Sequence, residues 1–254
     1  MLKLRHPRRR WFRRPLVLFA GATALAGALA AGAVWAAATP GEGERPVTTD
    51  EAGLLAVSRL TTFEASPLRV RITVPAPGRA VVVDGLVDYR SHHAVGAYHQ
   101  RDGGTDGLLV WDDRGLGLAP GAATDTPART AADLPHQAWS PRAYTADPLD
   151  AALRLAMALG ADRPDNPQLL AQAGPRRLRT ATLGGHRYTV FAGPPPAEGA
   201  RPHLRYWVDA DGRLGRVEAD LPGLSGPAVV EPAGRADGEQ VPNAPWQALP
   251  PQAP

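Results

Sequence analysis

The sequence predicts an α+β fold in which a few helices pack on one face of a large antiparallel sheet. Short segments with alternating apolar residues follow one another, separated by turns that contain Gly or Pro, which is typical of strands joined by hairpins. Helical patterns occur before the first strand and in the middle of the chain, but not between every pair of strands as in a parallel sheet. With 254 residues and 44% hydrophobic content, the chain can form one large core plus an appendage.

The composition limits the kinds of site that are possible. The chain has no Cys, which excludes disulfides, thiolate metal sites, cysteine nucleophiles and a lipidated cysteine. Seven of its basic residues and no acid precede residue 38, so the net charge of +3 becomes −4 (+3 minus +7) for the remainder. We therefore expect no nucleic-acid binding by the folded part.

The N-terminus predicts a membrane anchor. A basic segment, residues 1–15, precedes Leu16–Ala38, which is 23 residues without a charge. That length spans a hydrocarbon core of about 30 Å. Because a basic flank stays in the cytoplasm, the C-terminal bulk should be extracytoplasmic.

Two alternatives to an uncleaved anchor stay open. The segment could be a secretory signal cut after Ala36-Ala37-Ala38, although it is longer than the usual signal core of about 7–15 residues. Arg9-Arg10-Trp11-Phe12 partly matches a twin-arginine export signal, but Arg13 and Arg14 follow where an apolar residue is usual. The remainder is extracytoplasmic in each case.

The composition divides the rest into a linker at 39–47, a domain at 48–241 and a Pro-rich tail at 242–254, which should be extended or disordered. Thr48 and Glu51 have the spacing of a capping box and predict a helix to about Thr62, with Leu54, Val57 and Leu60 facing inward.

Four strands of an antiparallel meander should follow this helix. The expected strands are 69–74, 79–89, 94–100 and 107–111, and Gly85 is expected to mark a bulge or bend in the second. Leu118–Pro135 is poor in large apolar residues and predicts a long, disordered surface loop.

Two helices have clear start and stop signals. Asp147-Pro148 provides an N-cap and a first-turn proline, and Gly160 ends that helix. Its apolar stripe contains Leu149, Leu153 and Met157. Asn166-Pro167 and Gly174-Pro175 repeat the same signals around a shorter helix at 167–173.

Two hairpins come next. One joins 177–183 to 186–192 through Gly184-Gly185, and the other spans Leu204–Leu221 around Asp209–Gly212. Leu204, Tyr206 and Val208 share one face of the second hairpin, which must be covered by apolar residues. A last strand is expected at 228–231.

The candidate metal and catalytic groups have simpler interpretations. His92, His93 and His99 with Asp88 could bind a metal, but adjacent strand residues point to opposite faces, and turn or surface histidines fit better. Asp209-Ala-Asp211-Gly212 resembles the start of a calcium loop but lacks the later ligands, so a structural turn is favoured. We therefore expect no enzymatic activity, no metal and no cofactor.

The chain resembles extracytoplasmic proteins of LolA-like fold, in particular the LppX/LprG lipoproteins. The resemblance lies in Tyr206-Trp207-Val208-Asp209 with the Asp211-Gly212-Arg213-Leu214 turn, the late capped helix 147–160, and the closing Gly238-Glu239-Gln240-Val241-Pro242. It implies a curved, half-barrel antiparallel sheet that wraps helices around an apolar cavity. Family members bind lipids or lipidated proteins there, and some relatives sense envelope stress. Because this chain lacks the lipidated Cys, its tether would be Leu16–Ala38, which argues against a shuttling carrier.

The sequence therefore predicts a membrane-anchored extracytoplasmic protein that holds a lipid or another apolar ligand between sheet and helices. The candidate cavity residues are Trp111, Leu149, Leu153, Met157 and Trp207. The alternative is an envelope sensor or scaffold that binds a protein partner, which should have a filled core and an exposed apolar patch. A hydrolase or metal enzyme is a third possibility.

Overall fold

The computed structural model describes residues 43–243 except 102, 123, 198–199 and 202. The predicted basic segment, the predicted span Leu16–Ala38 and most of the Pro-rich tail lie outside the described residues. Within the described ranges, no helix has both the length and the apolar content that crossing a bilayer requires.

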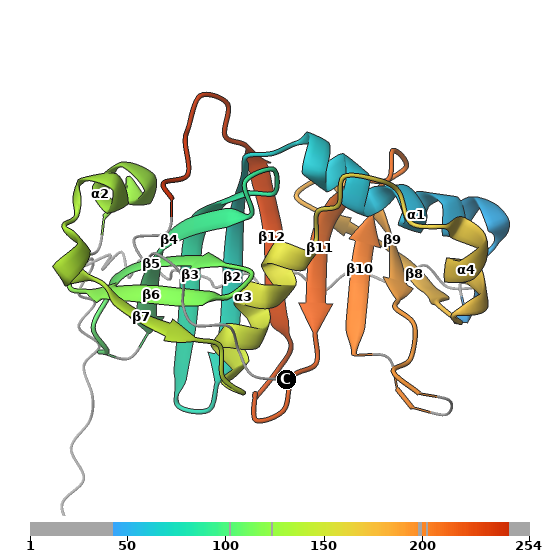
Figure 1. The fold of residues 1–254 in the computed structure, drawn as a ribbon. Coiled ribbons are helices and arrows are strands. Elements are labelled where there is room, and N and C mark those ends of the chain that lie inside the picture. Colours follow the sequence, from blue (N-terminus) through green and yellow to red (C-terminus); the bar gives the residue numbers. More distant parts are fainter. Residues whose placement is uncertain (1–42, 102, 123, 198–199, 202, 244–254) are drawn as a thin grey trace, which may run out of the picture. The chain divides into compact units, whose positions relative to one another are not determined.

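The described residues form an α+β fold around one antiparallel sheet, as predicted (Figure 1). The strands are β1 (Arg45–Pro46), β2 (Leu68–Ala76), β3 (Arg79–Asp88), β4 (His93–Arg101), β5 (Gly107–Asp112), β6 (Gly115–Pro120), β7 (Ser140–Ala143), β8 (Arg176–Leu183), β9 (His186–Ala192), β10 (Leu204–Val208), β11 (Leu214–Ala219) and β12 (Ala228–Arg235). The helices are α1 (Thr49–Glu64), α2 (Pro127–Asp133), α3 (Pro148–Ala158), α4 (Pro167–Gln172) and the short 3₁₀ helix η1 (His136–Ala138).

The sheet has 12 strands in the order β1-β8-β9-β10-β11-β12-β2-β3-β4-β5-β6-β7. Most neighbouring strands are consecutive in the chain and antiparallel, so that short turns can connect them. The pairing of β12 with β2 is long-range and joins the two runs of hairpins. The sheet is open, with β1 and β7 at its two edges. The half-barrel curvature that the resemblance implies stays a prediction.

The helix termini follow the local signals in the sequence. Thr48 and Glu51 form the predicted capping box at the start of α1. Asp147 caps α3 by accepting a hydrogen bond from the Leu149 amide, and Asn166 caps α4 in the same way. The inward face of α1 differs from the prediction: Ala52, Leu55 and Ala56 are buried, whereas the predicted Leu54, Val57 and Leu60 are only partly buried. Small residues at the contact let α1 lie close to its neighbours, and this displaces the larger side chains to its flanks.

The prediction of a disordered loop at Leu118–Pro135 is wrong. The end of β6 and all of α2 lie in this stretch, and η1 and β7 follow. α2 begins at Pro127, and it packs against the sheet through the buried side chain of Ala131. The stretch lacks large apolar residues because α2 packs through alanines, a pattern that is hard to distinguish from a loop.

Gly85 marks a close contact between strands, not the predicted bulge or bend. The pairing of β3 with β2 and with β4 is continuous, with Gly85 opposite Val70 and Gly96. A Cβ atom on Gly85 would lie 2.4 Å from the carbonyl oxygen of Val95, so a side chain cannot be accommodated without moving the backbone.

The core is split between the two faces of the sheet. The main cluster joins α1 and α3 to one face and contains Leu55, Ile72, Trp111 and Leu153. A second cluster joins α2 to the opposite face of β3, β4 and β5, with residues such as Leu86, Val95, Leu108, Ala131 and Trp139. The helices therefore lie on both faces, and not on one as expected. The reason is the alternation of β3, in which Val83 and Val87 face α3 while Leu86 faces α2.

A buried ion pair fixes the start of α3. The Asp150 carboxylate is fully buried and accepts hydrogen bonds from both Arg142 nitrogens, at 2.6 and 2.7 Å, and from the amide and hydroxyl of Thr145, at 2.7 and 2.8 Å. Burial alone would raise the pKa of Asp150, but the hydrogen bonds from Arg142 and Thr145 hold it below its ordinary value. The edge strand β7 is thereby tied to α3.

Replacing Asp150 by Asn should therefore destabilise the fold. The change leaves Arg142 without its counter-ion, and we expect a loss of about 3 kcal/mol in the free energy of unfolding, at the low end for buried pairs because Arg142 is partly exposed. Urea denaturation of the full chain in detergent measures this loss. Asp147→Asn is the matched control, because Asn also caps helices, and it should change stability by less than about 0.5 kcal/mol.

The pH dependence of stability provides a second test of this pair. Because the folded-state pKa of Asp150 lies below the unfolded value of about 3.9, its contribution is complete above that pH and disappears as the pH falls through the folded value. The Asp150→Asn variant should lose less stability than the wild type over this acidic range. Equal losses in the two proteins would contradict the assignment.

Candidate functional site

Four of the five predicted cavity residues lie together. Trp111 of β5 and Leu153 of α3 are buried in the main core cluster, and Leu149 and Met157 of α3 pack against it. Trp207 of β10 belongs to a small cluster on the opposite face, with Ala181 and Val190. The structure therefore separates Trp207 from the predicted α3 site.

The space between α3 and the sheet is occupied by side chains. Ala152, Leu153 and Ala156 are fully buried, and Trp111 is 1% exposed. The small alanines let the helix lie close to β2 and β12, which are among its contacts, and Leu153 fills the remaining volume. The predicted residues thus make a close-packed contact between helix and sheet.

The C-terminal end of α3 is held by a buried tyrosine. The Tyr89 hydroxyl donates a hydrogen bond to the Ala156 carbonyl oxygen at 3.1 Å, and burial raises the pKa of Tyr89. Gly160, just after the helix, lies against the Tyr89 ring, where a Cβ atom would be 2.4 Å from the ring carbons. Both ends of α3 are therefore anchored, the first by Asp150 and the second by Tyr89.

One polar atom in this contact has no partner. The indole nitrogen of Trp111 is buried and forms no hydrogen bond within the described part of the chain. An N–H group left unpaired in an apolar core costs about 1–3 kcal/mol. A ligand oxygen at this position would remove that cost.

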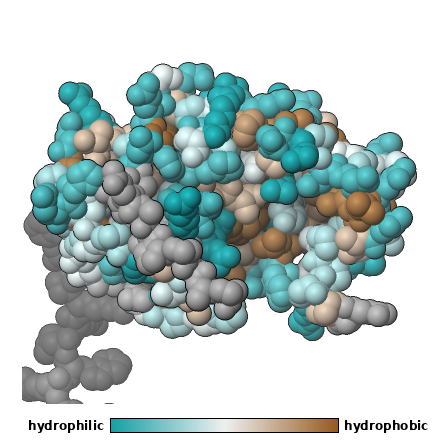
Figure 2. Space-filling model, viewed as in Figure 1, coloured by the Kyte–Doolittle hydropathy of each residue, from teal (hydrophilic) through white to brown (hydrophobic). Residues whose placement is uncertain are grey.

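Beside α3, the same face of the sheet carries partly exposed apolar side chains. We call this surface the β10 strip, and its residues are Leu155 of α3, Leu170 of α4, Leu204 and Tyr206 of β10, and Leu221 just after β11. In Figure 1, β10 and β11 run between α3 and α4. Figure 2 shows hydrophobic residues gathered over this region and again at α4.

One border of the β10 strip is polar. Arg59 of α1 pairs with Asp165 at 3.4 Å and donates to the Ala158 carbonyl oxygen at 3.1 Å, so the segment between α3 and α4 is fixed to α1. Burial raises the pKa of Tyr206, with Arg59 opposing and Asp165 adding to the shift, so the Tyr206 ring lies near this ion pair. The strip is thus an apolar surface with charged residues along one edge.

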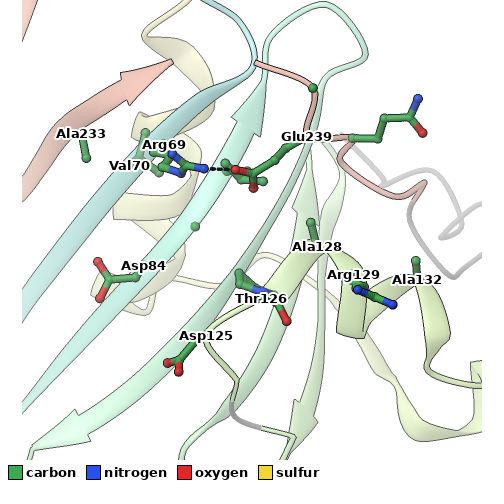
Figure 3. Close-up of a pocket in the computed structure, with 15 residues that line it drawn as sticks. Arg69, Val70, Asp84, Asp125, Thr126, Ala128, Arg129, Ala132, Ala233 and Glu239 are labelled. Atoms are coloured by element: carbon green, nitrogen blue, oxygen red, sulfur yellow. Dashed lines mark hydrogen bonds and ion pairs between the residues drawn. The ribbon is translucent and has the colours of Figure 1, made fainter. Parts of the chain in front are cut away.

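Two hollows lie elsewhere in the described part of the chain. The first, of about 720 Å³, is bounded by β2, β3, the α2 region and the segment after β12, and an Arg69–Glu239 ion pair lies across it (Figure 3). The second, of about 590 Å³, lies between the end of α1 and the turns near His186 and Asp209. Both are lined by charged and apolar residues together, and neither is lined by any of the five predicted cavity residues.

Trp207 is buried beneath charged side chains on the outer face of the sheet. Its ring lies 5.0 Å from the guanidinium of Arg216 and 5.6 Å from that of Arg179, which are cation–π contacts. Arg216 also pairs with Glu231 of β12 at 2.6 Å. Ion pairs across strands continue this pattern on both sides, as Arg205 with Glu218 and Arg71 with Asp84. Trp207 therefore stabilises the polar face, and the site prediction did not anticipate this role.

The histidines do not converge. His92 adopts a left-handed turn conformation with φ of 57°, and His99 pairs with Asp106 at 3.1 Å. Asp88 instead accepts hydrogen bonds from Ser66 and Ser91. Over the described ranges, no three His, Asp or Glu side chains are placed to hold a metal ion.

The Asp209–Gly212 segment forms a structural turn. Asp209 accepts hydrogen bonds from the amides of Asp211 and Arg213, both at 2.8 Å, and Gly212 has a φ of 80°. The carboxylate is thus used by the backbone of its own turn, as the preferred interpretation of the sequence held.

Comparison with known proteins gives no family. No protein-family model and no curated protein sequence match the chain. A solved structure of the Pseudomonas aeruginosa MucA/MucB complex aligns with 15% identity and a TM-score of 0.33, covering 80% of this chain and 66% of that chain. A TM-score this low supports no inference about fold or function.

Mutations in the close-packed contact between α3 and the sheet should cost more stability than mutations in the partly exposed β10 strip. Leu153→Ala should lower the free energy of unfolding by about 3 kcal/mol, because it leaves a cavity in a fully buried site. Leu155→Ala, on the partly exposed flank of the same helix, should cost about 1 kcal/mol or less. Urea denaturation of both variants checks this, and similar costs at the two positions would contradict the placement of Leu155 on a partly exposed surface.

Proposed function

We propose that the chain is a non-catalytic, membrane-anchored extracytoplasmic module that binds a protein partner through the β10 strip. The observation that carries the proposal is the division of one sheet face into two sectors. Under α3 the face is filled by Leu153 and the buried alanines, whereas over β10 the apolar residues Leu204 and Tyr206 remain partly exposed.

The partial exposure of the strip favours a partner that brings its own apolar face. Small apolar ligands are usually held in cavities that bury 70–90% of their surface. The β10 strip is instead a surface between helices, and an amphipathic segment of a protein could cover it while its polar face stays in water. The Arg59–Asp165 pair at its border would then orient the partner through charged groups at the edge.

The predicted anchor at Leu16–Ala38 agrees with this role. A tethered module cannot leave the membrane, so a fixed binding partner in the envelope suits it better than the transport of a lipid between membranes. The absence of a lipidated Cys points in the same direction.

A second candidate function is the binding of a lipid or another apolar ligand beneath α3. The unpaired indole nitrogen of Trp111 favours it, because a ligand carbonyl or headgroup oxygen could accept that hydrogen bond. Here α3 would have to move away from the sheet, and Trp111, Leu149, Leu153 and Met157 would line the opened space. This candidate requires breaking the Asp150 and Tyr89 anchors.

Site-specific photo-crosslinking distinguishes the two candidates. A benzophenone amino acid is introduced into the full chain at Leu155 or at Tyr206, and the cells that produce it are irradiated. The matched control is Arg154, which neighbours Leu155 on α3 but is exposed and lies over the Tyr144 ring. We expect the same protein-sized adduct from positions 155 and 206, and no such adduct from position 154.

The other outcomes count against the proposal. An adduct of only a few hundred daltons would favour the lipid candidate. The absence of any adduct at positions 155 and 206, or an identical pattern at all three positions, would overturn binding through the β10 strip.

A further inference from the structure

Leu169 of α4 is an exposed large apolar side chain without an explanation in the fold. It is 64% exposed and stands out in this respect among the residues that the structure describes. Its helix is well defined, because Asn166 caps it and Leu170 packs against the main core. Leu169 is therefore presented to the solvent by a fixed element.

Leu169 lies in an uncharged segment that is bordered by residues of both charges. No charged residue occurs from 166 to 175, and the helix itself contains only Pro, Gln, Leu and Ala. Asp165 directly precedes this stretch, and Arg176 follows it. Arg163 is 85% exposed and pairs with Asp162 at 3.5 Å, and Arg176 forms an ion pair with Glu44. Because the segment from 166 to 175 carries no charge, it can approach a membrane interface without the cost of desolvating one.

The position of α4 brings it to the place where the chain enters the domain. α4 contacts α1, and α1 begins three residues after β1. β1 in turn pairs with the start of β8, which follows α4 in the chain. Figure 1 shows the start of α1, α4 and β8 at the same end of the sheet.

The predicted span and the first described residue are separated by a short linker, which limits how far β1 and α4 can lie from a bilayer. If the predicted span ends at Ala38, only residues 39–42 separate it from Gly43, the first described residue. Five steps between Cα atoms reach at most about 18 Å in a fully extended chain. An anchor that ends at Ala38 would therefore hold the end of the sheet that carries β1 and α4 near the lipid surface.

We propose that α4 rests on the bilayer, with Leu169 inserted among the lipid headgroups. This inference rests on the membrane anchor of the proposed function. It gives the domain a fixed orientation, in which α4 contacts the lipid and the β10 strip stays open to a partner in the aqueous phase.

The chain provides a clean test, because it contains no cysteine. Leu169→Cys and Asp113→Cys each introduce a single thiol into the full chain, which is labelled with a nitroxide and incorporated into nanodiscs of 3:1 phosphatidylcholine and phosphatidylglycerol. Asp113 is the control, because its side chain is 75% exposed in the turn between β5 and β6, strands distant from β1 in the sheet order. Replacement of a side chain as exposed as Leu169 should leave folding intact.

Power saturation by electron paramagnetic resonance reports where each label lies. We expect the label at 169 to collide with oxygen several-fold more, relative to a water-soluble nickel chelate, than the label at 113, and to lie about 5–10 Å inside the headgroup boundary. If both labels are equally aqueous in a chain that has entered the nanodisc, docking of α4 is overturned and the anchor stands. A chain that does not enter the nanodisc overturns the anchor and this inference together. Neither result depends on what binds the β10 strip.

Discussion

The packing of α3 against the sheet is the contact on which the rest of the structure depends. α3 covers parts of β2, β3, β5 and β12, so it lies over the junction at which the two runs of hairpins meet. Leu153 and two alanines fill the contact, and Asp150 and Tyr89 fix the two ends of the helix. Because each of these interactions is buried, moving α3 would expose apolar surface and a carboxylate that is partnered only in place.

Beside this contact, the outer and the inner face of the sheet around β10 differ in character. The outer face of β10, β11 and β12 is covered by cross-strand ion pairs and by the arginines around Trp207. The inner face of β10 is apolar and only partly covered. Because a partner can cover partly exposed apolar side chains, this is the surface on which we place the proposed binding.

Local signals made much of the fold predictable. Asp147 and Asn166 act on amides two or three residues away, so the starts of α3 and α4 could be inferred from a few residues. Long-range contacts could not be inferred in this way. Neither the pairing of β12 with β2 nor the packing of α2 on the opposite face leaves a periodic pattern. The alternation of β10 does place Trp207 opposite Tyr206, so its separation from the α3 site could have been anticipated. That Leu153 fills the space under α3 depends on how closely two alanines let the helix approach, which only the structure provides.

The central claim is that α3 is a fixed part of the core and that binding occurs beside it. Hydrogen–deuterium exchange of the full chain, read by mass spectrometry over peptides from α3, β2 and β3, tests this directly. If α3 is fixed, its amides open only when the sheet unfolds, and they should exchange as slowly as those of β2 and β3. Amides of α3 that exchange at least tenfold faster, while β2 and β3 remain protected, would show that the helix lifts independently and would contradict the account.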